Sequence, residues 1–130
     1  MSKKASSFYH LNNSYRNRDM KTFKFRNHLV KDIQEGRKTV TWRLFDDKNL
    51  SVGDRLELLN SESGEKFAEA EITQVREKKL TQIKEADFEG HEKYSSSEVM
   101  LQHYQEYYGH KVTMDTLIKM IDFKVLRFLK

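Results

Sequence analysis

The sequence of 130 residues contains no cysteine. Disulfide bonds, thiolate zinc sites and cysteine nucleophiles are therefore excluded. No stretch approaches the roughly 18 consecutive apolar residues of a membrane-spanning helix, and Met1–Phe8 lacks the apolar core of a signal peptide. We therefore expect a cytoplasmic protein with no membrane association.

Other common site signatures are also missing. The sequence has no glycine-rich phosphate-binding loop and no internal repeat. Its five histidines lack the spacing of metal ligands. We therefore expect neither a metal site nor a cofactor.

The net positive charge of the body of the chain is small. The net charge is +4, but residues 1–20 hold four basic residues and one acidic residue, so the other 110 residues carry only +1. This distribution argues against a large duplex-binding face. Residues 1–19 are basic, polar and without an apolar period, and we predict that they are poorly ordered and precede a single domain of residues 20–130. Such a lead could add nonspecific affinity for nucleic acid.

The apolar periodicity predicts strands with helices inserted between them. Period-two alternation favours strands at 21–25, 38–43, 55–59, 66–76 and 117–128, although 117–121 also fits a helical period. A helix is predicted from Asn27, as N-cap, to Gly36, followed by a short helical turn at 80–83. A later helix would begin at a capping box of Ser95 and Glu98 and end at Gly109. The predicted fold class is α+β: a small curled sheet or barrel with two to three peripheral helices.

One stretch combines polar and apolar chemistry unusually closely. In the strand that includes residues 38–43, side chains alternate between two faces. The polar face would carry Thr39, Thr41 and Arg43, and the apolar face would carry Val40, Trp42 and Leu44. Lys38 stands at the beginning of the strand, where its long side chain can reach the polar face. This arrangement indicates a site for an anionic or highly polar ligand.

Three stretches together resemble a known family. Gly36–Arg43 has the pattern Gly-x-Lys-Thr-x-x-x-Arg, and it is followed by Val52–Leu56 and Ala70–Val75. These residues resemble the ASCH domain of the PUA-like superfamily over residues 20–126. The resemblance implies a small PUA-like β-barrel with a cleft beside the first stretch. PUA-like domains commonly bind RNA or modified bases.

The resemblance also implies a set of site residues. A small bacterial branch of ASCH proteins removes the acetyl group from N4-acetylcytidine with a Lys, a Thr three residues later, and a Glu from the linker before the late helix. An Arg two residues beyond the Thr belongs to the same pocket. By position these correspond to Lys38, Thr41, Glu92 and Arg43. Glu89 is the alternative acidic residue. Unlike that branch, this chain carries Trp42 and the loop of residues 45–48.

The same residue types suit two different functions. A Lys of lowered pKa could activate Thr41 as a nucleophile, a carboxylate could protonate the leaving amine, and Arg43 could stabilise the oxyanion. Alternatively, Lys38 and Arg43 could contact phosphate while Thr41 and Glu92 bond a base edge. Thr39 and Glu89 would be further ligand contacts.

Our leading hypothesis is an ASCH domain whose polar cleft binds RNA or a nucleoside-like ligand. The first alternative is a metal-independent amidohydrolase that acts on N4-acetylcytidine. The second is a protein-interaction adaptor without a small ligand.

Overall fold

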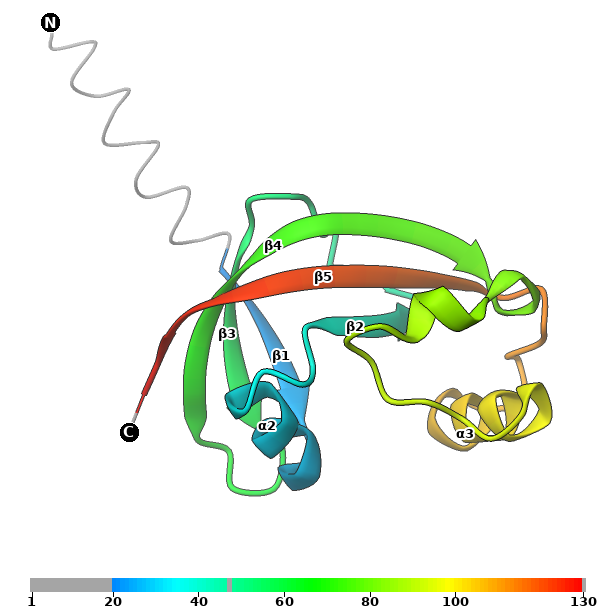
Figure 1. The fold of residues 1–130 in the computed structure, drawn as a ribbon, viewed down its shortest axis with the longest axis horizontal. Helices are drawn as coiled ribbons and strands as arrows, with labels where there is room; N and C mark the ends of the chain where they lie inside the picture. Colours follow the sequence, from blue (N-terminus) through cyan, green and yellow to red (C-terminus); the bar gives the residue numbers. More distant parts are fainter. Residues whose placement is uncertain (1–19, 47, 130) are drawn as a thin grey trace, which may run out of the picture.

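Five strands form one curled sheet (Figure 1). The computed structural model describes residues 20–46 and 48–129, so the prediction for residues 1–19 lies outside the described part. The strand order is β1-β3-β4-β5-β2, in which β1 pairs with β3 in parallel and the other neighbours are antiparallel. The strands are β1 Lys21–Phe25, β2 Val40–Leu44, β3 Arg55–Asn60, β4 Lys66–Lys79 and β5 Leu117–Phe128. The predicted α+β class, a small curled sheet with two peripheral helices, is confirmed.

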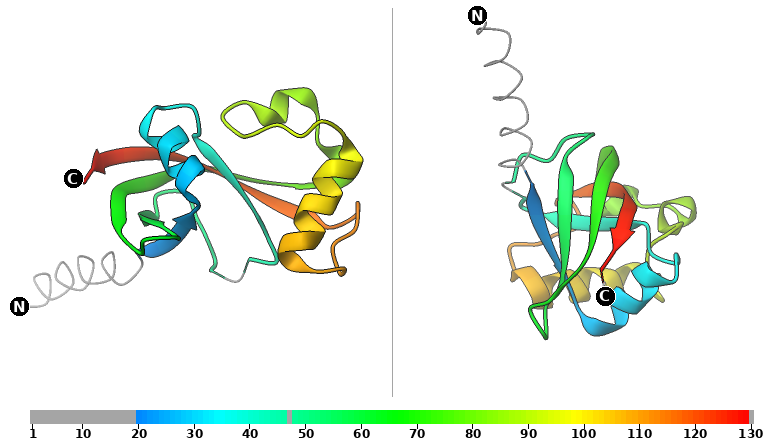
Figure 2. Two further views of the ribbon diagram at one scale, coloured as in Figure 1. Left: turned by 90° about the horizontal axis from the view of Figure 1, so that it is seen from below. Right: turned by 90° about the vertical axis from the view of Figure 1, so that its left-hand side faces the viewer.

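Two helices and two short 3-10 turns complete the described chain. Helix α2 spans Asn27–Gln34 and α3 spans Ser97–Tyr108, with the turns η1 at Leu80–Gln82 and η2 at Glu85–Phe88. In two views the helices lie apart, with β2 running between them (Figures 1 and 2). No helix within residues 20–46 and 48–129 is both long enough and apolar enough to cross a membrane.

The curl of the sheet comes from irregular pairing of the two longest strands. The register of β4 against β5 shifts between Glu69 and Ala70 and again between Ile72 and Gln74. Extra residues of this kind bend a strand and increase its twist. The curl brings the edge strands β1 and β2 towards each other, and the Arg43 guanidinium of β2 lies 4.3 Å from the centre of the Phe23 ring of β1.

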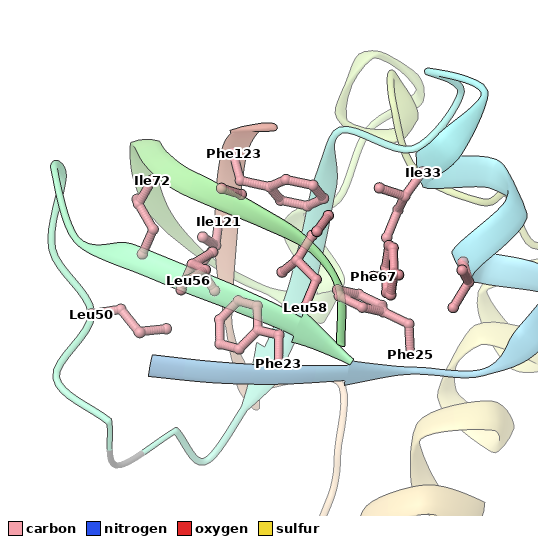
Figure 3. Close-up of a cluster of buried hydrophobic side chains, with 13 residues drawn as sticks. Phe23, Phe25, Ile33, Leu50, Leu56, Leu58, Phe67, Ile72, Ile121 and Phe123 are labelled. Atoms are coloured by element: carbon pink, nitrogen blue, oxygen red, sulfur yellow. The ribbon is translucent and has the colours of Figure 1, made fainter. Parts of the chain in front are cut away.

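Two apolar clusters fill the two ends of the curled sheet. One joins β1, β3 and the first half of β4 to α2, and its side chains are drawn in Figure 3. The other joins β2 and the first half of β5 to α3, through Trp42, Met100 and Tyr104 among others. Ala68 and Ala70 are fully buried in the first cluster, as expected for small residues at a tight contact. β4 and β5 run past both clusters and hold them in one frame.

The helix starts differ from the sequence prediction by one residue. The N-cap of α2 is Arg26 rather than Asn27, because the Arg26 carbonyl accepts the first helical bonds and the Asn27 amide donates to Glu62. The N-cap of α3 is Ser96 rather than Ser95, and its hydroxyl accepts from the Val99 amide. The predicted helix end at Gly36 is confirmed by its φ of +81° directly after the C-cap residue.

Helix α3 buries only part of its apolar surface. The side chains that α3 buries are Met100 and Tyr104, one turn apart, whereas Val99 and Tyr107 are exposed. Residues four apart share one helix face, so Met100 and Tyr104 form the buried stripe of α3.

Candidate functional site

A cavity of about 620 Å³ opens across β2 between the two helices. One wall comes from the end of β1, the start of α2 and the β3–β4 turn. The other wall comes from α3. The floor comes from β2 and the linker after η2, and its lining residues are Lys38, Thr41, Trp42, Arg43, His91 and Glu92.

Backbone hydrogen bonds place Lys38 at the cavity floor. After α2 ends, the amides of Arg37 and Lys38 both donate to the Asp32 carbonyl, which turns the chain into β2. The Lys38 side chain is only 4% exposed. Its Nζ donates to the Val40 carbonyl at 2.9 Å and to Glu92 Oε1 at 2.7 Å.

The linker that carries Glu92 is fastened directly to β2. The Gly90 carbonyl accepts from the amides of Thr39 and Val40, at 2.9 and 3.3 Å. Two residues later, Glu92 meets Lys38 across a sequence separation of 54 residues. Glu92 stays partly open to the cavity, with 36% of its side chain exposed.

Burial and pairing have opposite effects on the pKa values of Lys38 and Glu92. Burial lowers the pKa of Lys38; attraction by Glu92 works against this shift without cancelling it, and repulsion by Arg43 adds to it. Burial alone would raise the pKa of Glu92, but Lys38, together with His91 and a backbone hydrogen bond, outweighs it and lowers this pKa. Glu92 is therefore a carboxylate at neutral pH, beside an amine that loses its proton more readily than an ordinary lysine.

Arg43 and Thr41 form a second polar pair on the same strand. The Arg43 Nε donates to Thr41 Oγ1 at 3.3 Å, and Thr41 is buried. The guanidinium lies over the rings of Phe23 and Phe25, at 4.3 and 5.3 Å from their centres. Burial lowers the pKa of Arg43, but a guanidinium remains charged at neutral pH. A fixed cation thus donates to the one hydroxyl of the floor.

Stacked rings form the rest of the floor. The rings of Trp42 and His91 are stacked with centres 4.0 Å apart, and Phe88 packs on the same indole at 5.3 Å. His91 Nδ1 lies 2.8 Å from the Glu92 carbonyl, which only accepts, so this nitrogen carries the proton. Burial, reinforced by the charge of Lys38, lowers the pKa of His91 to about 4. His91 is therefore neutral at pH 7.

A buried carboxylate anchors the start of the linker. Asp87 Oδ2 accepts from Lys78 Nζ and from the Lys84 amide, both at 2.8 Å, and Oδ1 lies 3.5 Å from the guanidinium of Arg76. Burial alone would raise the pKa of Asp87, but these bonds outweigh it and lower this pKa. Lys78 and Arg76, near the end of β4, thus hold η2 against that strand.

The structure brings four of the six predicted site residues together. Lys38, Thr41, Arg43 and Glu92 all line the cavity, whereas Thr39 and Glu89 are exposed and do not. The geometry therefore favours Glu92 over Glu89 as the acidic partner of Lys38. Residues that the sequence reasoning did not place in the site also line it: His91, His103, Tyr104, Tyr107 and Tyr108. Only the adjacency of His91 to Glu92 could have signalled one of them.

Solved structures provide the comparison with known proteins. No protein-family model matches the chain, and no curated relative was found. A DUF984 protein from Enterococcus faecalis matches with a TM-score of 0.70 at 18% identity, covering 100% of this chain and 97% of that chain. An ASCH domain from Lactobacillus crispatus matches with a TM-score of 0.67 at 18% identity, covering 85% of this chain and 80% of its own.

A third similar structure is also an ASCH protein. An ASCH protein from Zymomonas mobilis matches with a TM-score of 0.60 at 11% identity, covering 86% of this chain and 74% of its own. The chain has the ASCH fold. The resemblance found in the sequence is thereby confirmed at the level of the fold. In this ASCH fold, the Gly36–Arg43 stretch forms the turn and strand that make the cavity floor.

Proposed function

We propose that the cavity binds the base of a nucleoside-like ligand, either free or within RNA. The observation that carries the proposal is the Lys38–Glu92 pair at the floor of a cavity of about 620 Å³. This volume lies within the range of roughly 300–1,000 Å³ that small-molecule sites occupy. A buried charged pair that faces such a cavity supports recognition of a polar ligand.

The floor supplies both kinds of hydrogen-bonding partner that a base edge requires. The Glu92 carboxylate accepts hydrogen bonds, whereas Lys38 and Arg43 donate them. One acceptor beside two donors complements the cytosine edge, which offers an amino group beside a ring nitrogen and a carbonyl. The tyrosines of α3 provide aromatic faces on the adjoining wall.

Calorimetric titration with cytidine tests the binding function. We expect Glu92→Gln to weaken cytidine binding by about tenfold, because it replaces a charged acceptor of the amino group. Glu89→Gln is the matched control, since Glu89 lies three residues away in the same linker but is exposed and outside the cavity. Equal affinities for both variants and the unchanged protein would place the ligand elsewhere.

A second candidate function is hydrolysis of N4-acetylcytidine, favoured by the lowered pKa of the buried Lys38. Thr41 Oγ1 would attack the acetyl carbonyl carbon and pass its proton to the neutral Lys38 amine. The carbon–nitrogen bond would then break, with the proton delivered to the departing amino group of cytidine, and water would release acetate from Thr41. Arg43 would donate to the developing oxyanion.

The resting geometry sets a condition on this reaction. Lys38 Nζ donates to Glu92 and Val40, while Thr41 Oγ1 accepts from Arg43. Lys38 must therefore exchange one of its bonds for the Thr41 hydroxyl when a substrate enters.

Chromatography of the products after incubation with N4-acetylcytidine tests the hydrolase function. We expect turnover to fall at least about 100-fold in Lys38→Met, because the general base is lost. Lys124→Met, an exposed lysine of β5 outside the cavity, should be unaffected. Absence of turnover by the unchanged protein would reject this candidate and leave the binding function intact.

A further inference from the structure

The two side walls of the cavity have different chemistry. The α3 wall is largely aromatic and includes Tyr104, Tyr107 and Tyr108. The opposite wall carries Lys24 at the end of β1, Arg26 at the N-cap of α2 and His28 in its first turn. All three of these basic side chains are exposed, so they form a rim rather than part of the floor.

The rim cations are available to a ligand. Within residues 20–46 and 48–129, neither Lys24 nor Arg26 has a carboxylate within ion-pair distance, whereas Lys21, Arg37, Lys66 and Arg127 are all paired. The first turn of α2 contains no acidic residue, so no side chain of the helix itself offsets the positive end of its dipole. The positive charge at the rim is therefore only partly neutralised.

One carboxylate belongs to the same wall. Glu62 lines the cavity and its Oε2 accepts from the Asn27 amide at 3.0 Å. This bond ties Glu62 to the backbone at the start of α2. The two permanent cations, Lys24 and Arg26, still exceed this single negative charge, so the wall attracts anions.

We propose that Lys24, Arg26 and His28 form a phosphate subsite, so that the ligand is a nucleotide rather than a free nucleoside. This inference rests on the proposed function, because the floor must hold the base. A base held at Lys38 and Glu92 leaves its sugar directed towards the mouth, where the cationic rim meets a phosphate. Charge-assisted bonds from Arg and Lys to phosphate are the usual chemistry of such contacts.

Calorimetry with a matched ligand pair tests the subsite. We expect cytidine 5′-monophosphate to bind about tenfold more tightly than cytidine. In Arg26→Ala, the affinity for the monophosphate should fall to the affinity for cytidine. The affinity for cytidine itself should stay unchanged. Lys31→Ala is the control, because Lys31 is an exposed cation of α2 that does not line the cavity. Added salt should reduce the advantage of the monophosphate.

The phosphate could belong to a free nucleotide or to the backbone of RNA, and a third ligand distinguishes the two. Cytidylyl-cytidine without a terminal phosphate carries only a phosphodiester. If it binds as tightly as the monophosphate and depends equally on Arg26, the subsite holds the backbone of RNA. If only the monophosphate gains affinity, the subsite holds a free nucleotide.

The failures of the two proposals are distinguishable. Equal affinity for cytidine and its monophosphate, or equal losses in Arg26→Ala and Lys31→Ala, would overturn the subsite while leaving the base pocket in place. Binding of the monophosphate without binding of cytidine, lost in Arg26→Ala, would support the subsite and contradict the base pocket. No binding of any of the three ligands would overturn both.

Discussion

At the scale of single residues, Gly90 has the strongest steric requirement. Its φ is +77°, and a Cβ built at this position would lie 2.2 Å from Thr39 Oγ1. The same residue offers its carbonyl to β2. A side chain here would require either the exposed Thr39 hydroxyl to rotate away or the linker that delivers Glu92 to Lys38 to shift.

Gly90→Ala should therefore destabilise the protein more than Gly64→Ala. Gly64 has nearly the same φ, +78°, but open space around it. The substitution Gly64→Ala therefore measures the backbone strain alone, which is about 1 kcal/mol. The contact with Thr39 should add on the order of 1 kcal/mol. Urea denaturation measures both values. In a Thr39→Ala background the additional loss should disappear, and equal losses in the two glycine variants would contradict the clash.

Single residues also show what the sequence could and could not predict. Thr41 and Arg43 share a face by strand alternation, and the resemblance adds Lys38, which stands at the beginning of the strand. Glu92 required the resemblance, because a contact across 54 residues has no local pattern. The tyrosines of α3 could not be assigned to the cavity, since the face that a helix turns to a site depends on its packing.

At the scale of elements, the linker between η1 and α3 determines the geometry of the site. It is fastened to β4 through Asp87, to Trp42 through Phe88 and His91, and to β2 through Gly90. Only after these attachments does Glu92 enter the cavity. These attachments could not be predicted from the sequence, because buried ion pairs look like solvent-exposed charges in a sequence.

Asp87→Asn should destabilise the protein by about 2 kcal/mol, because it leaves Lys78 and Arg76 without their buried partner. Glu85→Gln is the control within the same turn: its pair with Lys93 is highly exposed and should contribute little. Urea denaturation gives the stabilities. Hydrogen exchange at the Thr39 and Val40 amides should accelerate in Asp87→Asn alone, since both donate to the linker. Indistinguishable behaviour of the two variants would remove Asp87 from this role.

Helix and strand positions were predicted well, and helix starts less well. Each strand was recognised because alternating apolar residues line one face of a half-buried sheet. The N-cap of α2 is Arg26 rather than Asn27, because Glu62, from a distant turn, accepts a hydrogen bond from the Asn27 amide. At the start of α3, three consecutive serines at 95–97 carry the same hydroxyl, and the register of the helix decides which one caps it.

At the scale of the whole molecule, pH should act on stability through the floor of the cavity. His91 faces Lys38 and Glu92, with His103 also contributing to its environment. Its pKa is about 4 in the folded protein, compared with an ordinary value near 6.5. Between these values the unfolded chain binds more protons at this position, so stability falls as the pH is lowered from 6.5 to 4.

The variant His91→Phe should lose less stability as the pH is lowered from 6.5 to 4. Phenylalanine can still stack on Trp42 but cannot take up a proton. Relative to pH 7, the unchanged protein should lose up to about 3 kcal/mol more than the variant by pH 4. Denaturation curves recorded across this range measure the difference. Parallel pH profiles for the two proteins would show that His91 does not titrate as its burial requires.

The stacking of Trp42 on His91 has an optical consequence. Because the sequence contains a single tryptophan, all of the indole fluorescence of the protein comes from the floor of its cavity. Imidazole in its protonated form quenches a stacked indole more strongly than neutral imidazole does. The emission of the native protein should therefore report the protonation of His91 and, under the proposed function, the binding of cytidine, without any attached label.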